Sequence, residues 1–76
     1  MKTYNFSFIL LDLNINDFET IADKLYVSCN DALVSMSNKI ITVEFDREDN
    51  SLKEAMDSAR KDVLNSGVCK KIKEIK

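Results

Sequence analysis

The fold is decided by residues 31–48, Asp-Ala-Leu-Val-Ser-Met-Ser-Asn-Lys-Ile-Ile-Thr-Val-Glu-Phe-Asp-Arg-Glu, which read as two strands folded back on each other at Asn38 and Lys39. In the second half, Ile41, Val43 and Phe45 alternate with polar residues, the period of a strand with one buried face. The first half alternates more weakly and carries no charge until Lys39. Because asparagine tolerates a positive φ, the pattern predicts a tight turn at Asn38.

Helical patterns flank this hairpin on both sides. Asn16, with Glu19 three residues later, predicts the N-cap of a first helix. Ser51-Leu-Lys-Glu54 is a capping box that predicts the start of a second helix, and Gly67 stands where a left-handed helix stop is expected. Each helix carries one apolar stripe that we expect in the core, formed by Phe18, Ile21, Ala22, Leu25 and Cys29 in the first and by Leu52, Ala55, Met56, Ala59 and Val63 in the second.

Two further strands are predicted at the ends of the chain. Residues 3–13 are apolar on both faces toward their end, which is typical of a central strand, and residues 68–75 alternate imperfectly, since Ile75 is out of phase with Val68 and Ile72. The order β-α-β-β-α-β predicts an α+β, ferredoxin-like fold for residues 1–76 as a single domain. We expect a four-stranded antiparallel sheet with both helices on one face. The first and third strands should lie in the centre, with the hairpin's first strand and the last strand at the two edges.

Composition limits the classes of function. The chain has 76 residues, near the lower size at which one core suffices without a metal, a disulfide or a partner. Residues 1–69 carry 12 acidic and 7 basic side chains, whereas residues 70–76 carry four lysines and one glutamate. An acidic body argues against nucleic acid as the main partner, because affinity for phosphate needs clustered basic residues.

Cysteine usage and hydropathy limit the classes further. The chain has two cysteines, Cys29 and Cys69, and no histidine, which excludes a Cys/His zinc site. We expect two buried free thiols in a cytoplasmic protein, with a disulfide between them as the alternative. The longest apolar run, residues 8–11, is too short for a signal peptide or a membrane span, so no membrane association is expected. No cofactor and no metal are expected.

Several short motifs resemble a group of small bacterial proteins of unassigned function. The group shares Cys-Asp-Asp-Ala-Leu, then Phe-Asp-Arg-Glu, then Ser-Leu-x-Glu-Ala, and this chain has matching runs at residues 29–33, 45–48 and 51–55. It departs from the pattern with Asn30 in place of aspartate and with little glycine in the hairpin. The resemblance implies a bacterial or phage origin and the same fold, and it implies no activity.

The densest ionisable cluster, Phe45-Asp46-Arg47-Glu48-Asp49, has two interpretations. The carboxylates could act with Arg47 in acid–base or metal chemistry, helped by Asp12 or Asp31. Alternatively, the acids are exposed ahead of the second helix, where its dipole favours negative charge, and Arg47 pairs locally. The second interpretation is favoured. RNA binding in the manner of an RRM is disfavoured, because the strand phenylalanines share a phase with the core.

Two surfaces are candidates for an interface. The edge strand that contains Ala32, Val34 and Met36 is uncharged, whereas lysines guard the opposite edge, so the first edge could pair with another strand. Ile9, Leu11 and Ile40 are expected on the sheet face without helices, where they would form an apolar patch. Both features predict an interface.

We therefore expect a non-catalytic protein-interaction module that binds and restrains another bacterial protein, like an antitoxin or a phage-encoded inhibitor of host defence, and that forms a homodimer. A basic partner would meet an acidic surface formed by Glu19, Asp23, Asp46, Glu48, Glu54, Asp57 and Asp62. One alternative is a small-molecule-sensing regulatory domain that acts as a dimer. Another is a minimal metal-dependent enzyme at Asp12, Asp46 and Glu48.

Overall fold

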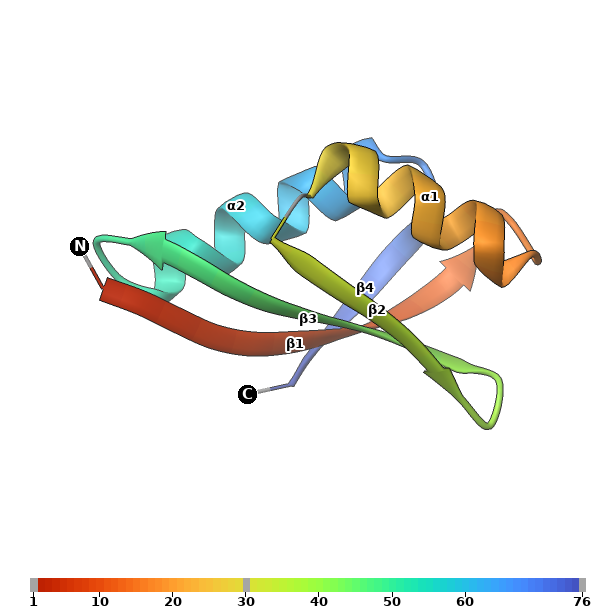
Figure 1. Ribbon diagram of the computed structural model, residues 1–76, viewed down its shortest axis with the longest axis horizontal. Helices are drawn as coiled ribbons and strands as arrows, with labels where there is room; N and C mark the ends of the chain where they lie inside the picture. Colours follow the sequence, from red (N-terminus) through yellow and green to blue (C-terminus); the bar gives the residue numbers. More distant parts are fainter. Residues whose placement is uncertain (1, 30, 76) are drawn as a thin grey trace.

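The computed structural model describes residues 2–29 and 31–75, which form six elements (Figure 1). These are β1 (Lys2–Leu13), α1 (Phe18–Ser28), β2 (Ala32–Ser37), β3 (Ile40–Asp49), α2 (Leu52–Asn65) and β4 (Cys69–Ile75). The strands form one antiparallel sheet in the order β2-β3-β1-β4, and both helices lie on the same side of it. The predicted ferredoxin-like fold is confirmed, including the two central strands and the two edges.

The hairpin between β2 and β3 turns at the predicted residues. Asn38 and Lys39 have φ angles of 52° and 66°, both in the left-handed region. Two consecutive positive φ values characterise the tight hairpin turn whose twist matches that of the flanking strands. This turn sets the register, which places Val34 opposite Val43 and Ser37 opposite Ile40.

The helix ends were predicted correctly for α2 but not for α1. The Ser51 hydroxyl oxygen accepts a hydrogen bond from the Glu54 amide at 3.2 Å, and Gly67 has a φ of 79°. The first helix is capped by Asp17, so the predicted cap at Asn16 is wrong. The Asp17 carboxylate accepts a 2.7 Å hydrogen bond from the Thr20 hydroxyl and makes no side-chain bond to a helix amide.

Three phenylalanines form the centre of the core. The ring centroids of Phe6, Phe8 and Phe45 lie 5.4 to 5.6 Å apart, and all three rings are buried between the sheet and the helices. Both predicted helix stripes pack against this cluster. Cys29 and Cys69 are buried and free, so the alternative of a disulfide between them is absent. Within residues 2–29 and 31–75, no helix is long and apolar enough to cross a membrane.

Candidate functional site

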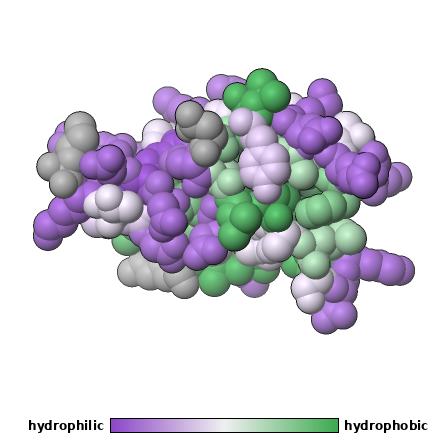
Figure 2. Space-filling model, viewed as in Figure 1, coloured by the Kyte–Doolittle hydropathy of each residue, from purple (hydrophilic) through white to green (hydrophobic). Residues whose placement is uncertain are grey.

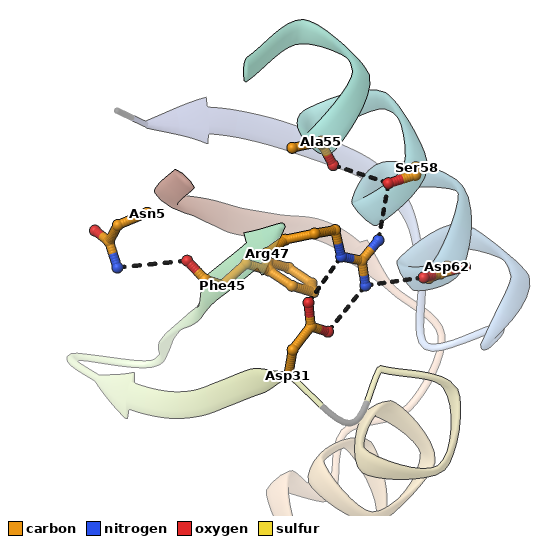
Figure 3. Close-up of polar contacts among 7 residues, drawn as sticks. All are labelled: Asn5, Asp31, Phe45, Arg47, Ala55, Ser58 and Asp62. Atoms are coloured by element: carbon orange, nitrogen blue, oxygen red, sulfur yellow. Dashed lines mark hydrogen bonds and ion pairs between the residues drawn. The ribbon is translucent and has the colours of Figure 1, made fainter. Parts of the chain in front are cut away.

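Arg47 lies at the centre of a polar cluster between the sheet and α2 (Figure 3). Its Nε and Nη2 atoms donate to the two carboxylate oxygens of Asp31 at 2.8 and 2.9 Å, and Nη2 also lies 3.0 Å from Asp62 Oδ2. Its Nη1 atom donates to Ser58 Oγ at 3.0 Å. The prediction that Arg47 pairs locally is wrong. Arg47 is in phase with the buried Phe45, so its side chain points toward the helices, where these three partners converge.

The cluster is electrostatically satisfied. The Arg47 side chain is only 14% exposed, and its guanidinium carbon lies 5.2 Å from the centroid of the Phe45 ring. The hydrogen bonds from Arg47 lower the pKa of Asp31, and Asp31 in turn raises the pKa of Arg47. Burial, followed by the nearby Asp62 carboxylate, raises the pKa of the Cys29 thiol to about 11. This thiol therefore stays protonated at neutral pH.

The same geometry indicates a structural role for the cluster. Ser58 Oγ accepts from Arg47 and donates to the Ala55 carbonyl at 3.1 Å, so its hydroxyl is fully engaged. A nucleophilic thiol needs a lowered pKa, whereas the pKa of the Cys29 thiol is raised. The arginine instead ties the start of β2 and the side of α2 to β3.

Asp12, Asp46 and Glu48, which would hold the metal ion in a metal-dependent enzyme, do not lie together. Asp46 and Glu48 lie on the same face of β3, where Asp46 pairs with Asn5, but Asp12 lies seven residues further along β1. Among residues 2–29 and 31–75, no group of three or more histidine, cysteine, aspartate or glutamate side chains is placed to hold a metal ion. This part of the chain therefore offers no preformed cation site.

The acids of the predicted acidic surface lie in three places. Four of them, Glu19, Asp23, Glu54 and Asp57, are exposed in the helical layer. Asp62 pairs with Arg47, whereas Asp46 and Glu48 lie on the sheet face opposite the helices. Lys24 follows Asp23 and Lys53 precedes Glu54, so the helical layer carries charges of both signs.

The sheet face without helices, which we call the open face, carries exposed apolar side chains. The exposed fractions are 60% for Leu33, 49% for Ile40, 41% for Leu11 and 38% for Ile75, and Ile9 is half-buried among them. The register confirms that they share a face: Ser7 pairs with Ile75, Ile9 with Lys73 and Leu11 with Lys71. Ile9, Leu11 and Ile40 were predicted to lie on this face.

Charges of opposite sign lie at two separate parts of the open face. On β3, Glu44 and Asp46 form what we call the acidic pair, and Asn5 Nδ2 donates to both at 3.0 and 2.8 Å. On β4, Lys71 and Lys73 form the basic pair, and Lys71 Nζ lies 3.8 Å from Asp12 Oδ2 in an exposed contact. Glu48 continues the acidic line toward the end of β3. The open face thus carries one exposed apolar side chain on each of its four strands, an acidic pair on β3 and a basic pair on β4.

The predicted interaction edge at β2 is partly capped by α1. The Val34 amide donates to the Tyr26 hydroxyl at 3.3 Å, and the Ala32 amide donates to the Cys29 carbonyl at 3.2 Å. The Val34 side chain is 7% exposed and faces the core, whereas Met36 is 53% exposed. Figure 2 shows hydrophobic side chains gathered over the middle of the molecule, where β2 runs below α1. The strand of a partner could therefore pair freely only with the part of β2 that follows Val34.

Leu33, Ile75 and Glu44 also belong to the open face, although only Ile9, Leu11 and Ile40 were predicted there. Leu33 and Ile75 lie on the open face because each is out of phase with a core residue of its own strand, Val34 and Ile72. The same alternation places the acidic pair out of phase with Phe45. Strand phase, applied to every strand, would have found these residues.

The chain was compared with protein-family models, curated proteins and solved structures, and none of these comparisons yields a match.

Proposed function

We propose that this chain is a non-catalytic protein-binding domain whose binding surface is the open face. The observation that carries the proposal is the set of four apolar side chains that stay 38 to 60% exposed on one sheet face. Exposed apolar side chains that share one face mark interaction sites in small proteins, since a monomer gains nothing by exposing them to water.

The proposal is further supported by the state of the reactive groups. The Ser58 hydroxyl is held by two hydrogen bonds, and the raised pKa keeps the nearby Cys29 thiol protonated. The charged groups around Arg47 are paired. The open face, in contrast, combines exposed apolar side chains with charged ones that are free to meet a partner, and protein interfaces combine both kinds of contact. In its finer form the proposal is a module that restrains another bacterial protein by covering it.

A matched pair of substitutions tests this proposal. Leu33→Asp places a carboxylate at the most exposed apolar side chain of the open face, whereas Val27→Asp makes a similar change at a side chain that is 88% exposed on α1. Immobilised wild type, Leu33→Asp and Val27→Asp chains would be compared for binding of a soluble copy of the chain and of proteins from a bacterial extract, identified by mass spectrometry.

We expect at least one stoichiometric partner that binds wild type and Val27→Asp but not Leu33→Asp. Circular dichroism of each variant checks that the fold is kept. The proposal is wrong if the three chains bind the same proteins, or if none of them binds any protein, including the soluble copy.

A further inference from the structure

We propose that the occupant of the open face is a second copy of this chain, related by a two-fold axis that sets the acidic pair of each copy against the basic pair of the other. The second copy would lie on the face described above, so this inference rests on the proposed function. It adds the identity of the partner and the residues that orient it.

The two charged pairs lie on the two strands that flank β1. The acidic pair lies on β3, in register with Asn5 and Ser7 of β1, and the basic pair lies on β4, in register with Ile9 and Leu11. Because β3 and β4 are the two neighbours of β1, the midpoint between the pairs falls on β1, between Ser7 and Ile9. A two-fold axis through that point, in the plane between two facing sheets, exchanges the pairs.

The same rotation also acts on the apolar side chains. The sheet can be drawn as a flat grid with about 4.8 Å between strands and about 3.4 Å between residues along a strand. On this grid, the two-fold rotation brings Leu33 over Leu11 of the second copy. It also brings Ile75 close to its own symmetry mate, because Ile75 lies near the axis. The axis was fixed by charge alone, and yet it matches Leu33 with Leu11 and Ile75 with its symmetry mate. The strands of the two sheets then cross steeply, closer to orthogonal than to aligned sheet packing.

The charges themselves must also be available to a partner. Asn5 holds both acidic side chains by its amide group, and among residues 2–29 and 31–75 no cation lies within ion-pair distance of them. Within the same residues, the one ion pair of the basic pair is the exposed, 3.8 Å contact of Lys71 with Asp12. Both pairs are therefore available to a partner of opposite charge.

Two other features favour face-to-face association over edge pairing. The β2 edge already uses two of its amides in bonds to Tyr26 of α1 and to Cys29 just after it, and the β4 edge carries lysines, which oppose pairing between like edges. A standard interface covers about 800 Å² of each partner, roughly a sixth of the 4968 Å² that the chain exposes. One face of a two-layer domain can supply that area.

The test is a charge exchange measured by light scattering and sedimentation. One variant carries Glu44→Lys with Asp46→Lys, and the other carries Lys71→Glu with Lys73→Glu. In each variant alone, like charges face each other across the axis, and we expect the dimer to weaken by on the order of a hundredfold. Mixing the two variants restores opposite charges at every contact, so we expect a heterodimer close to wild type in affinity.

The controls carry the same change of charge on the helical layer. Glu54→Lys with Asp57→Lys, and Lys53→Glu with Lys61→Glu, alter exposed side chains of α2 and should leave the dimer intact. Circular dichroism confirms that each variant is folded before its mass is measured.

Three results would overturn the inference. A wild type that stays monomeric up to about 1 mM excludes the second copy. If each charge-reversed variant still dimerises by itself, this orientation of the two copies is excluded. If both variants are monomeric and do not form a heterodimer when mixed, the acidic pair does not face the basic pair of the other copy. None of these results refutes the proposed function, which depends on whether Leu33→Asp, but not Val27→Asp, loses a protein partner of any kind.

Discussion

Replacing Arg47 with methionine tests whether the polar cluster stabilises the fold as its geometry indicates. The substitution keeps an apolar chain of similar length but removes the guanidinium. It breaks the two-pronged bond to Asp31, whose side chain is 25% exposed, and the contact with Asp62, whose side chain is 40% exposed. It also removes the hydrogen bond to Ser58 and the position above the Phe45 ring.

The expected loss follows from these contacts. Charge-assisted hydrogen bonds such as those to Asp31 contribute about 1.5–3 kcal/mol, a half-exposed ion pair such as that with Asp62 contributes at most about 1 kcal/mol, and the contact with the Phe45 ring contributes about 0.5–1 kcal/mol. We therefore expect Arg47→Met to lower the free energy of unfolding by about 3 kcal/mol. Domains of 76 residues have roughly 4–11 kcal/mol in total, so this loss is a large share.

Urea unfolding followed by far-ultraviolet circular dichroism measures this change. The midpoint should fall while the slope stays constant, because the surface exposed on unfolding is unchanged. Lys61→Met, which removes a charge from an exposed site on α2, serves as the control and should change stability by less than about 0.5 kcal/mol. A cycle with Asp31→Asn should give a coupling of about 2 kcal/mol, and a coupling near zero would refute the reasoning.

The pH dependence provides a second measurement. Arg47 lowers the pKa of Asp31 below its usual value of 3.8, so the folded chain holds this carboxylate charged where the unfolded chain begins to bind a proton. The resulting stability is fully present above the unfolded pKa and is lost as the pH falls through the lower, folded pKa. The stability difference between wild type and Arg47→Met should therefore be constant from about pH 7 to pH 5 and should shrink in more acidic solution.

Four further outcomes are expected. Tyr26→Phe removes the acceptor for the Val34 amide, so hydrogen exchange at Val34 should speed up at a cost below about 1 kcal/mol, and Tyr4→Phe, away from that edge, should leave this exchange unchanged. Gly67→Ala should cost about 1 kcal/mol in thermal melts, with a smaller loss for asparagine, because φ is 79° and an added Cβ meets nothing within 4 Å. The two buried thiols, whose pKa values are raised, should react with dithiodipyridine at pH 8 only as fast as the chain opens, and fast reaction of the native chain would contradict their burial. If the second copy binds as proposed, the melting temperature of wild type should rise with protein concentration, and that of the charge-reversed variants should not.

Most of the fold was predictable because its signals are local. The turn at Asn38, the capping box at Ser51 and the stop at Gly67 each depend on a few neighbouring residues, and each is confirmed. The start of α1 was predicted one residue early, because Asn16 and Asp17 are both good capping residues and the sequence does not distinguish them. Local signals thus fix which elements exist more firmly than where they begin.

The partners of Arg47 were not predictable in the same way. Asp31 precedes Arg47 by 16 residues and Ser58 follows it by 11, so their meeting depends on how α2 lies across the sheet. A neighbouring acid such as Glu48 is the obvious local partner, but it occupies the opposite phase of the strand from Arg47 and faces away. Strand phase excludes the wrong partner, and only the tertiary arrangement supplies the right ones.

Alternate side chains of strand β3 serve two different purposes, because one set stabilises the fold and the other lies on the open face. Phe45 and Arg47 point toward the helices and hold the layers together, while Glu44 and Asp46, between and beside them, point to the open face. We therefore expect charge reversal at the acidic pair to leave the core and the arginine cluster in place, and substitution of Arg47 to leave the open face intact. Because the two faces can be altered independently, a loss of association can be distinguished from a loss of folding, and a binding surface on this sheet can change without the fold having to change with it.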